Sequence, residues 1–121
     1  MACIIVGPGP DEGRYIILSE QDTVVGRDPD AHLSLHDASA SRQHLQLCFE
    51  PDARAHIATD LGSSNGTWLN GRRLDAGATL AEGDELLVGA TRLFFTEDEP
   101  IDDEDARRIV RSLAERPTQQ G

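Results

Sequence analysis

The segment 60–71 reads DLGSSNGTWLNG. Its first part is polar and rich in glycine, which is typical of a loop rather than of a helix or strand. Residues 67–69 (TWL) form a short β-like run, and the Asn70-Gly71 pair that follows is a strong signal for a two-residue hairpin turn. Residues 72–74 (RRL) are then the return strand. The segment therefore predicts a donor-rich loop that leads directly into a β-hairpin.

Short apolar runs separated by turn residues recur on both sides of this segment. In residues 44–49, Leu45, Leu47 and Phe49 share one face and His44, Gln46 and Cys48 take the other, which is the period-two pattern of a half-buried strand. Gly89-Ala90 is a second hairpin turn. The further strands expected are residues 3–6, 14–18, 23–25, 56–60, 85–88 and 91–96. Many short strands with regular turn signals predict an all-β sandwich or barrel.

The composition limits the classes of protein to which the chain can belong. Its 121 residues fit one domain with a modest tail. The formal net charge is -11, and all eleven basic residues are Arg. This balance argues against general nucleic-acid binding, which depends on a basic face that neutralises phosphates. Any anion site must therefore be built from Arg, backbone N–H groups and hydroxyls.

Targeting and redox features are sparse. No apolar run approaches the roughly 18 to 20 residues that cross a bilayer, and residues 1–6 do not resemble a signal peptide. Cys3 and Cys48 are too few for a disulfide framework. We therefore expect a cytoplasmic protein with two buried thiols.

The last part of the chain differs in pattern from the rest. Residues 97–100 (EDEP) form an acidic break, and residues 102–116 are typical of a helix that Pro117 ends. Its first turn is acidic, as the helix dipole favours. One narrow apolar stripe follows helical spacing: Ala106, Ile109, Val110 and Leu113. This helix either docks on the sandwich, frays in solvent, or leads to another domain of a longer chain.

Three polar clusters lie between the predicted strands, and together they hold the groups that a phosphate needs. They are residues 25–28 (VGRD), 41–44 (SRQH) and 60–67 (DLGSSNGT). They supply two guanidinium groups, several hydroxyls, a side-chain amide and glycine-rich backbone, which are suitable donors to a phosphate dianion. The planar fork of Arg holds two phosphate oxygens at once. Loops at one end of a sandwich commonly carry such groups, so we expect an anion-binding site there.

The order of these clusters resembles the pattern of the forkhead-associated (FHA) family. The pattern reads Gly26-Arg27, then residues 41–44 (Ser-x-x-His), residues 63–67 (SSNGT) and Asn70-Gly71. The spacing and the flanking strands are similar to that family across residues 3–96. The resemblance implies an all-β, FHA-like β-sandwich of about eleven strands. Residues 1–96 would be the phosphothreonine-binding domain, and residues 97–121 an acidic linker with a short amphipathic helix or tail.

The resemblance also implies a role for ten positions. Arg27 is similar to the family's main phosphate ligand, Ser41 and Ser64 to hydroxyl donors, and Asn65 to the residue that holds the ligand backbone. The positions expected to bind the phosphopeptide are Arg27, Ser41, Arg42, Ser64 and Asn65. The positions expected to support the binding loops are Gly26, His44, Gly66, Thr67 and Asn70.

The function implied is a phosphothreonine-dependent protein–protein interaction module in serine/threonine-kinase signalling. Its partner would be a phosphothreonine-containing protein or peptide. It would act as a monomer without catalysis, cofactor or metal, and would bind neither nucleic acid nor membrane. Two alternatives stay open: an interaction domain that recognises its partner without phosphate, and a small hydrolase with Ser41 as nucleophile and His44 as base. The hydrolase lacks a visible orienting acid and a nucleophile-elbow motif.

Overall fold

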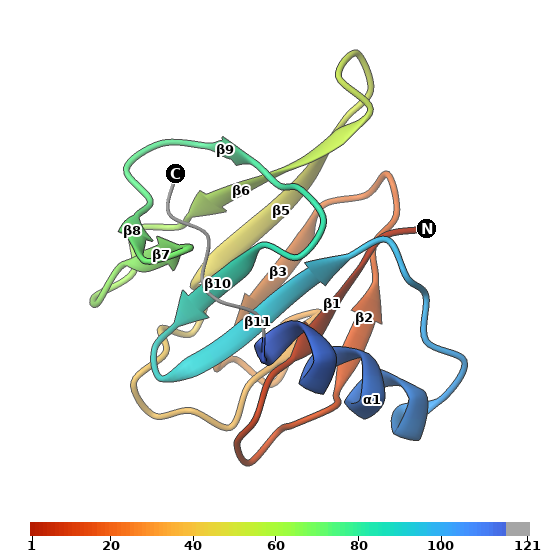
Figure 1. Cartoon of the computed structure of the whole chain (residues 1–121). Coiled ribbons are helices and arrows are strands. Elements are labelled where there is room, and N and C mark those ends of the chain that lie inside the picture. The colour runs from red at the N-terminus through yellow and green to blue at the C-terminus, as the bar shows by residue number, and fades with distance from the viewer. Residues whose placement is uncertain (116–121) are drawn as a thin grey trace.

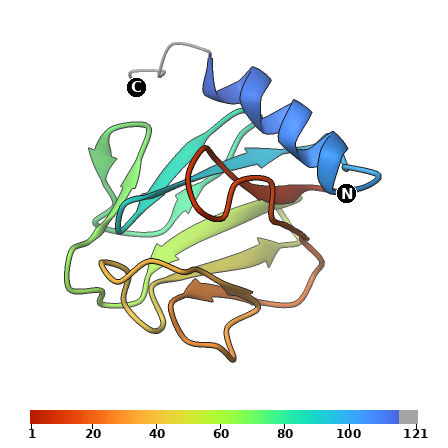
Figure 2. The ribbon, with the colours of Figure 1, turned by 90° about the horizontal axis from the view of Figure 1, so that it is seen from below.

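A computed structural model describes residues 1–115, so the expected helix end at Arg116 and Pro117 lies outside the described residues. Eleven strands and one helix lie within residues 1–115. The strands form two sheets that pack face to face, and the helix lies on the outer face of one sheet (Figure 1, Figure 2). The predicted all-β sandwich is confirmed, as is the strand number implied by the resemblance.

The two sheets have six and five strands within the described chain. In spatial order the larger sheet contains β2 (Tyr15–Ile17), β1 (Cys3–Val6), β11 (Thr91–Thr96), β10 (Glu85–Val88), β7 (Thr67–Leu69) and β8 (Arg72–Arg73). The smaller sheet contains β4 (Leu33–Ser34), β3 (Thr23–Gly26), β5 (Leu45–Glu50), β6 (Ala55–Asp60) and β9 (Ala78–Thr79). All paired strands are antiparallel except β3 and β4.

Both predicted two-residue hairpins are present. Asn70 and Gly71 have φ values of 50° and 85° between β7 and β8, and positive φ at both positions is what a type I′ turn requires. Gly89, with φ of 63°, begins the turn between β10 and β11. The strands β4 and β9 were not predicted, because each is two residues long and has no period-two pattern of its own.

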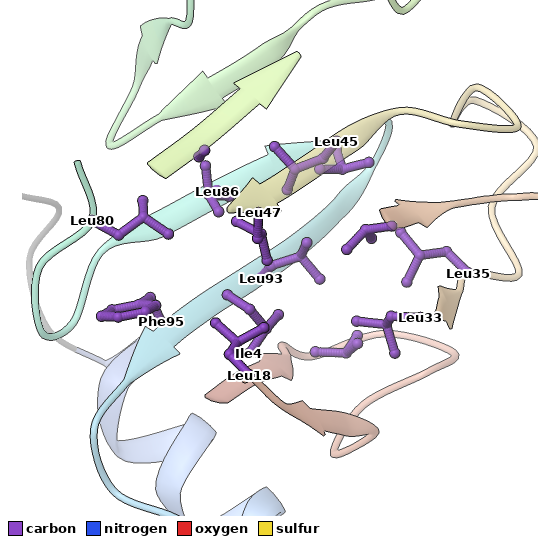
Figure 3. Close-up of a cluster of buried hydrophobic side chains, with 14 of the residues drawn as sticks. Ile4, Leu18, Leu33, Leu35, Leu45, Leu47, Leu80, Leu86, Leu93 and Phe95 are labelled. Atoms are coloured by element: carbon purple, nitrogen blue, oxygen red, sulfur yellow. The ribbon is translucent and has the colours of Figure 1, made fainter. Parts of the chain in front are cut away.

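The main core lies between the two sheets (Figure 3). Leu45 and Leu47 of β5 are fully buried and Phe49 is half-buried, so the predicted apolar face is confirmed. Leu86 and Leu93 of the larger sheet are also fully buried. Each such side chain contributes about 1.5–3 kcal/mol through burial. This core fixes the strand ends from which the polar loops emerge.

Two sequence expectations about side-chain placement are wrong. The period-two pattern puts His44 on the polar face with Gln46 and Cys48, but β5 begins one residue later and the His44 side chain is fully buried below the loops, where the resemblance expects it to support them. Cys48 was expected to be buried but is only half-buried, because it alternates outward from Leu47. Both Cys3 and Cys48 are free thiols.

The helix α1 (Asp103–Ala114) docks on the larger sheet. The carboxylate of Asp102 accepts a hydrogen bond from the backbone N–H of Asp105, which caps the first turn. The predicted stripe is confirmed as the buried face. It forms a second cluster with side chains of β1 and β11, namely Cys3, Ile5 and Phe94. No helix among residues 1–115 has the length and apolarity needed to span a membrane.

Candidate functional site

The three polar clusters meet at one end of the sandwich. The loops 35–44 and 61–66 lie side by side there (Figure 2). The backbone N–H of Ser64 donates to Ser41 Oγ at 3.0 Å. The side-chain amide of Asn65 donates to the carbonyl oxygen of Ser39, also at 3.0 Å. Two hydrogen bonds between segments more than 20 residues apart therefore join the loops into one surface.

Gly26 allows the closest approach in this surface. A methyl group at Gly26 would lie 2.1 Å from the carbonyl oxygen of Arg42, which is far inside van der Waals contact. The neighbouring N–H groups of Arg27 and Asp28 donate to the carbonyl oxygens of Ser41 and Arg42 at 3.0 and 3.1 Å. Only a residue without a side chain lets these two backbones pair so tightly.

The two arginines of the site are held differently. Arg27 is exposed, and its Nε donates to the carbonyl oxygen of Ala40 at 3.1 Å. Within residues 1–115, neither terminal nitrogen of this guanidinium forms a hydrogen bond, so both can donate to a ligand. The side chain of Arg42 is 69% exposed, and its Nη2 lies 3.6 Å from an oxygen of Asp28. Such an exposed pair is worth little, so Arg42 remains adjustable while Arg27 is preorganised.

The buried side chain of His44 connects the two loops through hydrogen bonds to their backbones. Its Nδ1 accepts a hydrogen bond from the backbone N–H of Ser41 at 3.0 Å, so the proton of the neutral ring lies on Nε2. Nε2 then donates to the carbonyl oxygen of Gly66 at 2.8 Å. Both ring nitrogens are thus engaged by backbone. Ser41 Oγ accepts from Ser64, so this pair does not have the nucleophile–base contact of a serine hydrolase.

Asp60 shapes the loop that contains Ser64 and Asn65. Its carboxylate accepts hydrogen bonds from the backbone of Gly62 and Ser63 and from the hydroxyls of Ser63 and Thr67. Partial burial acts to raise the pKa of Asp60, but these hydrogen bonds outweigh it and hold the pKa below its usual range. The loop is therefore organised around a carboxylate that stays ionised.

Asp37 has a similar role in the loop before β5. Its carboxylate accepts hydrogen bonds from Ser39 and, across the molecule, from the backbone of Ala90 and the hydroxyl of Thr91. Burial opposes ionisation, but the hydrogen bonds prevail and lower the pKa of Asp37 to about 2. This carboxylate therefore joins the loop to the β10–β11 hairpin.

Sequence reasoning missed the roles of Asp37 and Asp60. A local signal exists for both, because each Asp precedes a Ser by two or three residues, which is typical of a carboxylate that accepts from the following backbone. The hydrogen bonds between residues farther apart in the sequence, from the β10–β11 hairpin to Asp37 and from Thr67 to Asp60, have no such signal.

Asn70 lies at the edge of this region rather than in it. Its side chain donates to Asp84 and accepts from the backbone N–H of Glu85, both at 2.9 Å. Gly66 and Thr67 are buried at the base of the loop, whereas Ser64 and Asn65 are exposed. The structure therefore brings Arg27, Ser41, Arg42, Ser64 and Asn65 to one end of the sandwich.

The surface so formed is rich in donors to an anion. It presents guanidinium, hydroxyl, amide and backbone N–H groups on loops that hydrogen bonds hold together, among them the buried bond from His44 to Gly66. Within residues 1–115, no group of three or more His, Cys, Asp or Glu side chains is placed to hold a metal ion. The chemistry that this arrangement supports best is the binding of an oxyanion such as a phosphate.

Comparison with known proteins agrees with this geometry. The family model described as FHA domain matches residues 23–89, more than half of the chain. Over 84% of its length the chain is 36% identical to the glycogen accumulation regulator GarA of Mycolicibacterium smegmatis. Over 78% it is 35% identical to the oxoglutarate dehydrogenase inhibitor of Corynebacterium jeikeium. The chain spans 63% of the length of each of these relatives.

Solved structures lead to the same family. One was solved in a structural and functional analysis of phosphothreonine-dependent FHA domain interactions. It superposes with a TM-score of 0.71 at 26% identity, over 81% of this chain and 97% of that chain. The family model, the relatives and the superposition agree with the motif pattern on the loops. The chain belongs to the FHA domain family.

Proposed function

We propose that this domain binds phosphothreonine-containing segments of partner proteins and acts through binding rather than catalysis. The observation that carries the proposal is the position of Arg27. Its guanidinium is fixed by one backbone bond at the loop end, next to the joined loops that present Ser41, Ser64 and Asn65. A preorganised guanidinium beside hydroxyl and N–H donors is the arrangement that a phosphate dianion requires.

The proposed division of labour follows from the contacts. Arg27 pairs with the phosphate, and Ser41 and Ser64 donate hydrogen bonds to it. Asn65 holds the backbone of the bound segment, and Arg42 adds an adjustable cation. Gly26, His44, Gly66 and Thr67 keep the loops in place through the contacts given above. Asn70 supports them indirectly, because it fixes the neighbouring β7–β8 turn to Asp84 and Glu85. Two relatives are named as a regulator and an inhibitor, which supports a regulatory role for this domain.

We further infer that the domain works as a cytoplasmic monomer and binds neither nucleic acid nor membrane. The net charge of -11 supports the lack of binding to nucleic acid and membrane, because both nucleic acids and the cytoplasmic membrane surface are anionic. Measurement of the molar mass in solution tests the monomer, and a dimer at micromolar concentration would contradict it.

The test of the function is calorimetric titration with one peptide sequence in three forms. The forms carry threonine, phosphothreonine or phosphoserine at the same position. We expect binding of the phosphothreonine form, none of the unmodified form, and weaker binding of phosphoserine. The missing methyl group costs about 1–3 kcal/mol where a shaped site reads it. Equal affinity for the phosphorylated and unmodified peptides would contradict the proposal and favour phosphate-independent recognition.

A further inference from the structure

Arg73 lies beside the loop 61–66, which together with the loop 35–44 forms the recognition loops, and no role has been assigned to it above. It is on β8, directly opposite Trp68 of β7, and it is exposed. A methyl group at Gly66 would lie 3.2 Å from Cζ and from Nε of Arg73. The guanidinium therefore lies close to Gly66, one residue from Asn65. The absence of a side chain at Gly66 is what lets it lie so close.

Arg73 is not among the arginines of this acidic protein that form ion pairs. Five arginines form an ion pair with a carboxylate: Arg14, Arg42, Arg92, Arg108 and Arg111. Within residues 1–115, no carboxylate lies within ion-pair distance of Arg73. The chain has 22 acidic residues for 11 basic ones. A guanidinium without a carboxylate at a binding loop is therefore available to an anion from outside.

The negative net charge of the domain bears on whether it can bind an acidic peptide. A net charge of -11 repels acidic peptides at long range. A preference for an acidic peptide therefore needs a local cation that the partner touches directly. The proposed function assigns Arg27 and the hydroxyls around it to the phosphate itself. Arg73 lies at the Gly66 side of the loop, so it would contact the partner segment beside the phosphothreonine rather than at it.

We propose that Arg73 forms a second subsite that takes the carboxylate of an Asp or Glu side chain in the bound segment. This proposal rests on the proposed function, because the phosphothreonine places the segment along the loop. The planar fork of Arg binds a carboxylate with two parallel hydrogen bonds. The position of the guanidinium close to Gly66 limits the conformations open to it before binding, which lowers the entropy lost when the carboxylate is captured.

The experiment is a scan of phosphothreonine peptides by fluorescence anisotropy at low salt. Asp replaces Asn, one position at a time, at the three residues on each side of the phosphothreonine. We expect Asp to raise the affinity of the wild-type domain by about three- to tenfold at one or two positions. Arg73→Gln abolishes this preference and leaves the melting temperature unchanged. Arg73→Lys retains only part of it, because a point charge does not bind in a bidentate manner.

The matched control is Arg54→Gln. Arg54 lies in the turn between β5 and β6, whereas the recognition loops begin at the other end of this hairpin, and it is also exposed. The control loses the same charge and is expected to keep the Asp preference. No Asp preference in the wild type, or the same preference in Arg73→Gln, would overturn the subsite while phosphothreonine binding stands. If no phosphothreonine peptide binds better than its unmodified form, the proposed function fails and the subsite fails with it.

Discussion

Arg27 and Arg42 lie on neighbouring loops, but the structure restrains them to different degrees. Arg27 donates from Nε to a backbone carbonyl, which holds the plane of its guanidinium. Arg42 is largely in solvent and has only a distant pair with Asp28. A fixed donor loses less entropy on binding than a mobile one. The proposed site should therefore depend more strongly on Arg27.

We predict that Arg27→Ala weakens phosphothreonine peptide binding by about 2–5 kcal/mol, because a phosphate loses its charged partner. Arg42→Ala should weaken it by about 1 kcal/mol or less. The stability of Arg27→Ala should fall by no more than about 1.5 kcal/mol, the typical value of one hydrogen bond. Calorimetry and thermal unfolding measure these effects. Equal losses in the two variants, or unchanged affinity in Arg27→Ala, would refute the assignment.

The elements of the fold bring the loops into contact by close approach of their backbones. The end of β3 and the loop before β5 pair so tightly at Gly26 that a side chain has no space. Gly77, near the start of β9, differs, because the nearest atom to a methyl group there is a side-chain carbon of Ile57, at 3.0 Å. A side chain can move aside more easily than paired backbone.

We therefore predict that Gly26→Ala destabilises the domain by about 1–3 kcal/mol and also weakens peptide binding, since the loop must shift. Gly77→Ala should cost less and leave binding unchanged. Urea unfolding of both variants provides the comparison. A Gly26→Ala domain as stable as the wild type would show that the loop can relax without loss.

The helix α1 raises the question of whether the tail is part of the folded unit. Its buried face covers β1 and β11 and forms a cluster with Ile5 and Phe94. Ile101, just before the helix, is 86% exposed and serves as a comparison. We predict that Leu113→Ala destabilises the domain by about 2–3 kcal/mol, whereas Ile101→Ala changes stability by less than about 0.5 kcal/mol. Two-state thermal unfolding tests this. Equal effects would mean that α1 docks only weakly.

At the scale of the whole molecule, the carboxylates in the loops make the free energy of unfolding depend on pH. Hydrogen bonds lower the pKa of Asp37 from 3.8 to about 2 in the folded state, against the opposing effect of burial. A group whose folded pKa is lowered stabilises the fold at higher pH and loses this contribution as pH falls. We predict that stability from Asp37 is complete above about pH 4 and is lost between pH 4 and 2.

The expected size of this loss is on the order of 1–2 kcal/mol. Asp37→Asn should be less stable at pH 7 and should show a shallower decline between pH 4 and 2. Urea unfolding at a series of pH values measures both slopes. Parallel slopes for the variant and the wild type would show that Asp37 does not carry the effect.

Local patterns in the sequence were sufficient to predict most of the strands, the hairpins and the helix. Period-two alternation placed Leu45 and Leu47 in the core, and Asn70-Gly71 determined a hairpin, because both depend on residues only a few positions apart. The amphipathic stripe of α1 was equally visible. The motif order also selected the loop residues that the structure brings together.

Tertiary structure alone decided how these residues are held. It buried His44 between Ser41 and Gly66, placed the carboxylate of Asp37 against Thr91, 54 residues later, and laid Arg73 on Gly66. No local pattern encodes these contacts, because they depend on how the two sheets pack and where their strands end. Short-range chemistry determined the elements and the donors, and the packing of the sandwich determined which donors share a surface.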